Sequence, residues 1–149
     1  MKISRTTGYA VQATLQLAQA PAGQPIPCSK LASNGGMPER FLLQILRNLV
    51  THGVLRSTRG VDGGYCLDKP AAETSLLEVI EAVEGPLTAN VPGDNLPPEM
   101  SSRLHEALVK VNEQCRQHLA GVKLSAVIAN GNATSNGRAA SPSPATTSN

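Results

Sequence analysis

Apolar residues in the first part of the chain recur with the period of amphipathic helices, and turn-forming residues separate the segments. A first helix is predicted from Ser4 to Ala20, because three turn-forming residues follow it, Pro21, Gly23 and Pro25. Its buried rows are expected to be Ala10, Ala13 and Leu17 beside Val11, Leu15 and Ala18. A short second helix fits residues 28–34, and Gly35-Gly36 makes a turn after it.

The third predicted helix has the clearest pattern. Its apolar residues follow the i, i+3, i+4, i+7 spacing of a packed helix: Leu42, Ile45, Leu46 and Leu49. Pro38 suits the first helical position, where its missing N–H costs nothing, and His52-Gly53 ends the helix. The opposite face carries Arg40, Leu43, Gln44, Arg47 and Thr51. Such a helix can lie in the major groove of DNA, although an ordinary solvent-exposed surface helix has the same pattern.

A hairpin is predicted next. Residues 54–58 and 65–67 form two candidate strands, and the loop between them contains Asp62-Gly63, a frequent hairpin turn. A helix, a tight turn, a second helix and then a hairpin are the parts of a winged helix-turn-helix. The predicted fold is therefore mainly α-helical, with a small β-hairpin as the wing.

The second half begins with a helix at Ser75, where Ser75 and Glu78 form a capping box, and Gly85-Pro86 ends it. Its core stripe is predicted to be Leu76, Val79, Ile80 and Val83. A long helix follows a proline-containing loop. Along one side of this helix, a seam of mainly apolar residues recurs at intervals of four and three residues in turn. This seam predicts a dimer interface, or packing on the same domain, through Leu104, Leu108, Val111, Cys115, His118 and Val122.

Four regions are therefore expected. Residues 1–86 form a winged helix-turn-helix DNA-binding domain and residues 87–98 a loop. Residues 99–128 hold the dimerisation helix and a short C-terminal helix. Residues 129–149 are rich in Ser, Thr, Asn, Gly, Pro and Ala, and are expected to form a disordered tail because they contain too little apolar surface to offset the entropy of folding.

Charge is distributed unevenly. Residues 1–69 carry eight Lys or Arg against three Asp or Glu, whereas the rest of the chain carries five against eight. A basic first half fits a DNA-facing module. The chain has two Tyr, one Phe and no Trp, so no aromatic platform for single-stranded bases is apparent, and double-stranded DNA is the expected partner.

Composition also bears on the compartment. No apolar run approaches the length of a membrane span, and polar residues interrupt the first twenty positions, unlike a signal peptide. Three widely spaced cysteines argue against a secreted disulfide framework. The sequence therefore predicts a soluble cytoplasmic protein with no membrane partner. No phosphate-binding loop, nucleophile elbow or metal-ligand cluster is present, so an enzyme is not expected.

Several stretches carry a family resemblance. They are Met1-Lys2-Ile3-Ser4 with Tyr9-Ala10, Met37-Pro38-Glu39-Arg40-Phe41-Leu42 with Gln44-Ile45-Leu46, Gly53-Val54-Leu55 with Arg59-Gly60, Gly63-Gly64-Tyr65, and Leu77 to Leu87. Together they resemble the Rrf2 family of bacterial transcriptional regulators over about residues 1–128. The resemblance implies a homodimeric repressor or activator, with repression expected, that binds a palindromic operator. Its third helix would enter the major groove, its wing would contact the minor groove, and its long helix would pair the protomers.

The chain departs from the family pattern at two places. Members that hold an iron–sulfur cluster use three closely spaced cysteines after Gly-Pro-Leu, whereas residues 88–99 contain none. Because such clusters need thiolate ligands, no cluster and no other cofactor is expected. Leu43 replaces a frequent glutamate, and Gly60-Val61-Asp62 replaces Gly-Pro-Gly in the wing. The operator sequence is therefore not transferable.

Individual DNA contacts can be assigned on chemical grounds. Arg59 is expected to enter the narrow minor groove, and Gly60, Gly63 and Gly64 let backbone approach backbone, although these glycines also serve hairpin geometry. Arg40 and Gln44 can reach guanine and adenine edges, and Leu43 a thymine methyl group. Phosphate contacts are expected from Arg47, Lys2, Arg5 and Lys30.

Two other functions stay open. Leu43 and Asp62 are compatible with a dimeric protein-interaction adaptor that binds DNA weakly. Cys115 and His118 form a Cys-x-x-His pair, which two protomers can combine into a tetrahedral zinc site, so a thiol or metal sensor is the third hypothesis. Cys28, near a helix N-terminus, is either a redox-sensitive thiol or a structural one. An effector or a partner protein leaves no motif in the sequence.

Overall fold

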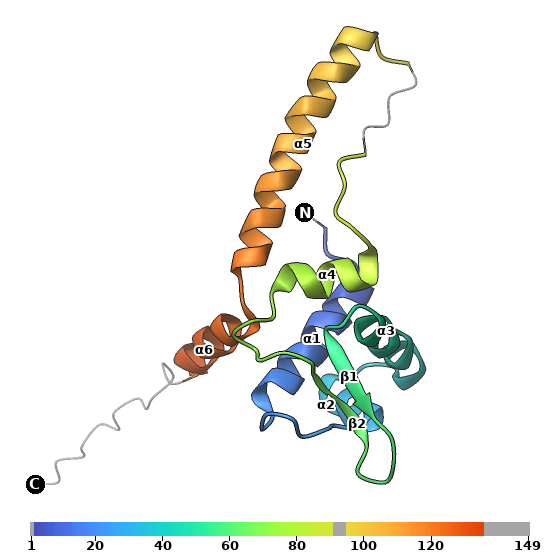
Figure 1. Ribbon diagram of the computed structural model, residues 1–149, viewed down its shortest axis with the longest axis vertical. Helices are drawn as coiled ribbons and strands as arrows, with labels where there is room; N and C mark the ends of the chain where they lie inside the picture. Colours follow the sequence, from blue (N-terminus) through green and yellow to red (C-terminus); the bar gives the residue numbers. More distant parts are fainter. Residues whose placement is uncertain (1, 91–94, 136–149) are drawn as a thin grey trace, which may run out of the picture.

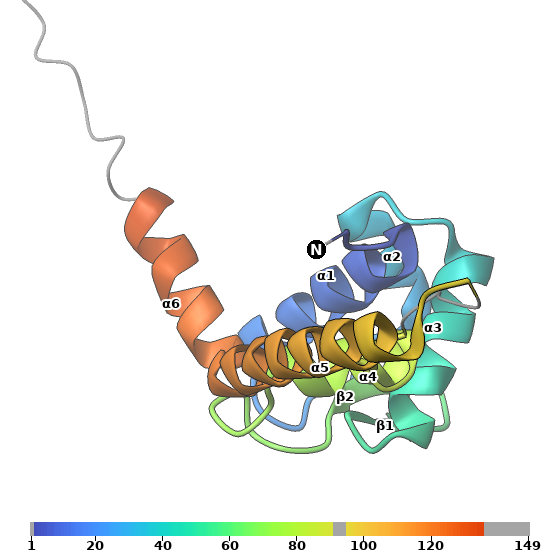
Figure 2. The same ribbon diagram turned by 90° about the horizontal axis from the view of Figure 1, so that it is seen from above.

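The computed structural model describes residues 2–90 and 95–135. Within them, six helices and one two-stranded antiparallel sheet follow the order α1, α2, α3, β1, β2, α4, α5, α6. Helices α1–α4 and the hairpin form one body, and α5 projects away from it (Figure 1). Viewed from above, α5 crosses the view in front of α4, and α6 extends to one side of the body (Figure 2). The mainly helical fold with a small wing is as predicted.

Helix α1 (Arg5–Gln19) crosses the centre of the body. Ser4 caps it, accepting a hydrogen bond from the backbone N–H of Thr7 at 3.1 Å, which satisfies a helix-terminal donor. Its buried residues are Thr7, Ala10, Ala13, Thr14 and Leu17. The predicted second row, Val11, Leu15 and Ala18, is only partly buried and packs against the edge of the core.

Helices α2 (Cys28–Gly35) and α3 (Glu39–Thr51) form the helix-turn-helix. Gly36 follows α2 with φ of 61°, a left-handed conformation that glycine adopts without strain. Pro38 was predicted as the first residue of the next helix, but it is the cap residue before it. Its ψ of 120° is extended, and its carbonyl accepts the first helical hydrogen bond, from Leu42 N at 2.9 Å.

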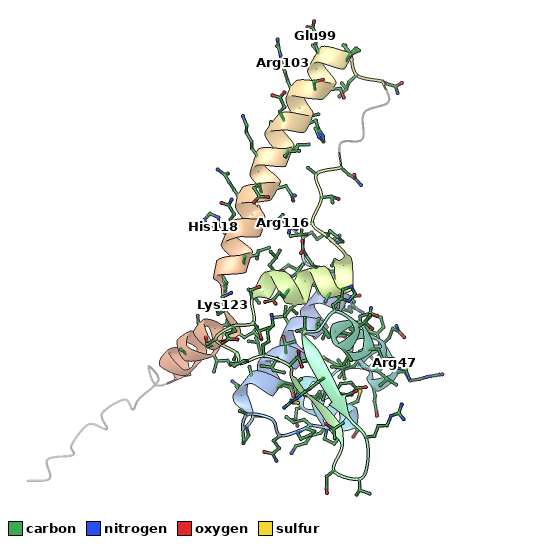
Figure 3. The ribbon with its side chains drawn as sticks, in the orientation of Figure 1. Arg47, Glu99, Arg103, Arg116, His118 and Lys123 are labelled. Carbon is green, nitrogen blue, oxygen red and sulfur yellow. The ribbon has the colours of Figure 1, made fainter. Side chains whose placement is uncertain are left out.

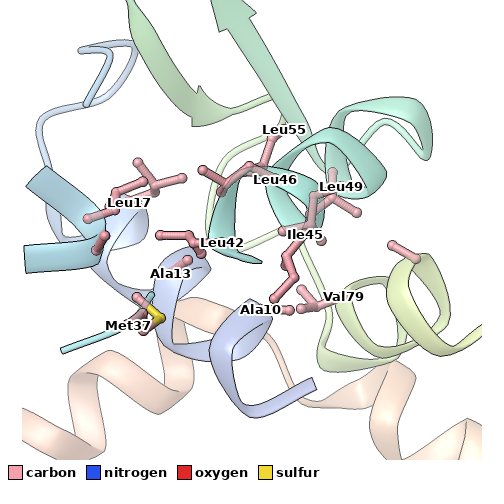
Figure 4. Close-up of a cluster of buried hydrophobic side chains, with 14 of the residues drawn as sticks. Ala10, Ala13, Leu17, Met37, Leu42, Ile45, Leu46, Leu49, Leu55 and Val79 are labelled. Atoms are coloured by element: carbon pink, nitrogen blue, oxygen red, sulfur yellow. The ribbon is translucent and has the colours of Figure 1, made fainter. Parts of the chain in front are cut away.

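The core lies between α1, α3 and α4 and is aliphatic. Small residues on α1, Ala10 and Ala13, let α3 approach closely, and the four predicted α3 residues are all buried there (Figure 4). Helix α4 (Leu76–Glu84) closes the core with Val79 and Ala82. Its capping box is present as predicted, whereas Leu76 and Val83 of its predicted stripe are only partly buried.

The wing is an antiparallel hairpin of β1 (Leu55–Thr58) and β2 (Gly64–Leu67). Two further backbone hydrogen bonds hold the hairpin to the segment before α2. Ile26 N donates to Tyr65 O and Tyr65 N donates to Ile26 O, each at 2.9 Å. The base of the wing is therefore fixed against the helix-turn-helix, and its turn extends away from the body (Figure 1).

Helices α5 (Pro98–Gly121) and α6 (Leu124–Ser135) complete the described chain. The fully buried Leu124 anchors the start of α6. The expectation of a disordered tail from residue 129 is wrong for residues 129–135, which continue α6; residues 136–149 lie outside the described residues. Extending an anchored helix costs far less than nucleating one, so a poorly apolar segment can continue it. None of the described helices is long and apolar enough to cross a membrane.

Candidate nucleic-acid interface

The exposed face of α3 lies opposite its buried stripe. Arg40, Gln44, Arg47 and Thr51 are exposed there, on one side of the helix. Arg47 extends from the body into solvent (Figure 3). Within the described residues, neither Arg40 nor Arg47 forms an ion pair, so both guanidinium groups keep their donors for another partner. Leu43 is half-buried at the margin of this face, on the side toward the wing.

An open concave surface of about 740 Å³ lies between α3 and the wing. It brings together six of the residues predicted to contact DNA, which are Leu43, Arg47, Arg59, Gly60, Gly63 and Gly64. Two sides of one hollow are thus formed by the helix and by the hairpin. A convex, negatively charged backbone can enter such a hollow between two basic side chains.

Sequence reasoning missed part of this lining, notably Ser57, Thr58 and Tyr65. Ser57 and Tyr65 are opposite each other in the hairpin, and the neighbouring pair, Arg56 and Cys66, faces the other side of it. The strand alternation was therefore the signal that could have identified Ser57 and Tyr65, whereas Thr58 lies at the end of β1, next to the turn. Their hydroxyl groups add hydrogen-bond donors to the hollow.

Contacts within the chain itself explain why glycine occupies two positions of the wing. A Cβ on Gly63 would lie 2.3 Å from the carbonyl oxygen of Thr58, and one on Gly64 would lie 2.4 Å from the carbonyl group of Ile26. Gly64 also has a φ of 150°. Both glycines are therefore required by the turn and by the contact at its base, whatever the wing binds. Gly60 has a φ of 113° and open space around it.

Three predicted phosphate-binding residues lie outside the concave surface. Lys30 is exposed on α2, and Arg5 is exposed at the start of α1. Lys2 lines a separate hollow of about 160 Å³ with Glu84 and Leu87, next to the end of α4. The structure does not bring these three side chains together with Arg47 and Arg59.

Each of the three cysteines lies on a different element. Cys28 is half-buried at the start of α2, and burial, followed by the nearby Glu39 carboxylate, raises the pKa of its thiol. Cys66 is buried in β2 and accepts a hydrogen bond from Arg56 Nε at 3.1 Å. Cys115 is exposed on α5. In the described ranges, no group of three or more His, Cys, Asp or Glu side chains is placed to hold a metal ion.

Helix α5 has no buried residue. The predicted seam residues are all exposed, and Val111 is 56% exposed. His118 lies on the side of α5 away from α4, and Arg116 lies on the side toward it (Figure 3). Val122, expected at the end of the seam, is instead the extended residue that ends α5, because its carbonyl accepts from Leu76 N at 2.9 Å.

A helix-turn-helix that carries exposed basic and amide side chains, joined to a two-stranded wing, defines the winged helix-turn-helix class. The profile of the Rrf2 family, described as an iron-dependent transcriptional regulator, matches residues 3–130. The chain belongs to the Rrf2 family, which is a family of transcriptional regulators and not of enzymes.

Individual relatives agree with this assignment. The chain is 42% identical over 89 residues to a protein of Mycobacterium tuberculosis described as an HTH-type transcriptional regulator. The match covers 60% of this chain and 55% of that relative, so the chain spans about half of the relative's length. It is 31% identical over 120 residues to an rrf2-like regulator of Rhodobacter capsulatus, covering 73% of this chain and 80% of the relative. Among solved structures, CymR, the global cysteine regulator of B. subtilis, has the same fold, with a TM-score of 0.73 at 22% identity over 87% of this chain and 98% of CymR.

Proposed function

We propose that the protein is a homodimeric, sequence-specific DNA-binding regulator that acts without an iron–sulfur cluster, and that it represses by occupying a palindromic operator. The observation that carries this proposal is the concave surface in which α3 and the wing present Arg47 and Arg59 to the same space. A protein built only for protein contacts does not require basic groups on both sides of one hollow.

The chemistry of each side chain supports a division of labour. Arg40 and Gln44, one turn apart on the exposed face of α3, reach base edges in the major groove, and the half-buried Leu43 contacts a thymine methyl group. Arg59 enters the minor groove from the wing. Arg47 binds a phosphate between these two contacts, and Lys2, Arg5 and Lys30 remain proposed phosphate contacts outside the hollow.

The exposed stripe on α5 supports a homodimer. Leu104, Leu108, Val111, Cys115 and His118 cover one side of a helix that is roughly 36 Å long. The stripe itself spans roughly 21 Å of the helix, and such an exposed apolar stripe is stabilised when a second copy covers it. In such a dimer each reading helix addresses one half-site, and half-sites roughly 34 Å apart follow if the two major grooves face the same side of the duplex.

The cysteine positions support a regulator without a cluster. The family is described as iron-dependent, but the three thiols of this chain lie on α2, β2 and α5, and the segment after Gly85-Pro86-Leu87 contains no cysteine as far as Glu99. This donor set does not fit a cluster held by three cysteines of one loop. The signal is therefore proposed to come from a small effector or a partner protein.

The proposal is tested by titrating a specific duplex with Arg59→Ala. Loss of the proposed minor-groove contact is expected to cost about 1–3 kcal/mol of specific binding. Arg103→Ala is the matched control, because Arg103 is exposed near the far end of α5 (Figure 3) and its loss removes the same charge. Equal affinities for Arg59→Ala and Arg103→Ala would refute the assignment of the wing, and weak unspecific binding by all variants would favour the adaptor function.

A further inference from the structure

Helix α5 is attached to the DNA-reading body at two places. At its C-terminal end, Leu76 N donates to Val122 O at 2.9 Å and Leu124 N donates to Thr74 O at 3.0 Å, so the end of the helix is held by backbone hydrogen bonds. The rest of α5 is without a buried residue, and its contacts with the body run mainly to α4. Backbone attachment at one end alone leaves a helix free to tilt.

The second attachment is a set of polar contacts that begins about one and a half helical turns before the C-terminal end of α5, at Arg116. Oε1 of Glu81, on α4, accepts from Arg116 Nη1 and also from Leu87 N, the latter at 3.0 Å. Asn112 Nδ2 donates to Leu87 O at 2.8 Å. These four residues, here called the Glu81 brace, tie α4, the segment that follows it and α5 to one carboxylate.

Partial burial strengthens the Glu81 brace. The side chains of Arg116 and Glu81 are 31% and 23% exposed, so water screens their attraction less than it screens an ordinary surface pair. Arg116 lies on the side of α5 that faces α4, and His118 of the proposed dimer stripe lies on the other side (Figure 3). The Arg116–Glu81 ion pair and the His118 edge of the stripe therefore lie on different sides of α5, whereas Asn112 is one turn from Leu108, at the margin of the stripe.

We infer that the Glu81 brace fixes the angle between α5 and the reading body, and thereby sets the half-site spacing that the dimer accepts. This inference rests on the proposed function, since it assigns a role within a dimer that binds DNA. Glu81, Asn112 and Arg116 are positioning residues in it and do not contact DNA.

The length of α5 makes the angle matter. The helix from Arg116 to Met100 is roughly 24 Å long, so a tilt of about 10° displaces one end relative to the other by about 4 Å. This displacement is similar to the rise of one base pair, roughly 3.4 Å. A dimer with a loose brace therefore tolerates spacers that differ by one base pair, whereas a dimer with a rigid brace rejects them.

The first test measures binding to operators whose spacer is shortened or lengthened by one or two base pairs. The wild-type protein is expected to prefer one spacer by about tenfold, and Arg116→Ala to bind neighbouring spacers within about twofold. Lys110→Ala is the matched control, because Lys110 is an exposed cation of α5 outside the brace. Arg116→Lys keeps the charge and is expected to restore part of the preference. An unchanged preference in Arg116→Ala overturns the inference.

The second test does not depend on DNA. A nitroxide at Thr51→Cys, in a background with Cys28→Ser and Cys115→Ala, reports the distance between the two reading helices of the free dimer. The wild-type brace is expected to give a narrow distance distribution and Arg116→Ala a broad one, and identical distributions overturn the inference. If Arg116→Ala does not dimerise, Asn112→Ala removes the other side-chain contact to the brace and takes its place. A narrow distribution in a protein that selects no DNA sequence refutes the proposed function and leaves the brace intact.

Discussion

At the scale of single residues, close backbone contacts set the position of the wing, and its charges are useful only in that position. The carbonyl group of Ile26 occupies the space where a side chain on Gly64 would begin, at 2.4 Å from a Cβ. The same Ile26 carbonyl accepts one of the two Ile26–Tyr65 hydrogen bonds that hold the hairpin. A side chain here must therefore displace the hairpin from the helix-turn-helix.

Gly64→Ala is accordingly expected to lower the free energy of unfolding by about 1–3 kcal/mol and to weaken DNA binding, because the clash involves backbone atoms. Chemical denaturation and a binding titration measure the two effects. Gly8→Ala is the control, since Gly8 lies in α1 with open space around it, and it is expected to be neutral or slightly stabilising. Similar losses in both variants would contradict the role given to the Ile26 contact.

At the scale of elements, local patterns predict most helices, and distant contacts decide the rest. The apolar stripe of α3 and the Ser75–Glu78 capping box are both local, and both are present where the sequence predicts them. The length of α6 was mispredicted because burial of Leu124, a tertiary contact, anchors it. The Arg116–Glu81 contact spans 35 positions, so no local spacing indicates it.

The candidate site follows the same division. The order of helix, turn, helix and hairpin was enough to assign Leu43, Arg47 and Arg59 to one DNA-binding module. The structure places all three around one hollow, because the second helix of the helix-turn-helix lies beside the wing. Charge alone also selected Lys2, Arg5 and Lys30, which the structure places elsewhere. A positive charge is common on any protein surface and does not by itself indicate a DNA contact. A positive charge on the second helix or the wing of this fold is stronger evidence for one.

The capping box of α4 predicts a pH dependence of stability. Burial raises the pKa of Glu78, but hydrogen bonds from Lys69 and from the backbone and hydroxyl of Ser75 outweigh it, so the pKa lies below its ordinary value of 4.5. The ionised carboxylate therefore adds stability above that value, and this stability is lost as the pH falls through the depressed pKa.

Glu78→Gln keeps the cap but cannot ionise. It is expected to be less stable than the wild type at pH 7, and the difference in melting temperature is expected to shrink as the pH falls below about 4.5. Thermal unfolding across this range measures it, with Glu106→Gln, at an exposed position of α5, as the control. A difference that stays constant with pH would show that the ion pair with Lys69 adds nothing.

At the scale of the whole molecule, the account depends on α5 pairing two copies. Val111 and Val109 are both exposed on this helix, at 56% and 43%, but only Val111 belongs to the proposed dimer stripe. Val111→Asp places a charge in the interface and is expected to give a monomer in sedimentation experiments, with weaker binding to a palindrome. Val109→Asp, on another side of α5, is expected to stay dimeric. Dissociation by both variants, or by neither, would contradict the assignment of the stripe.

The central claim is that the hollow between α3 and the wing reads DNA sequence. Its most direct test is selection of bound duplexes from a random pool by the purified protein, followed by titration of the selected duplex against scrambled DNA at several salt concentrations. The account predicts enrichment of a palindrome that is bound about a thousandfold more tightly than scrambled DNA. Failure of folded, dimeric protein to enrich any sequence would contradict it.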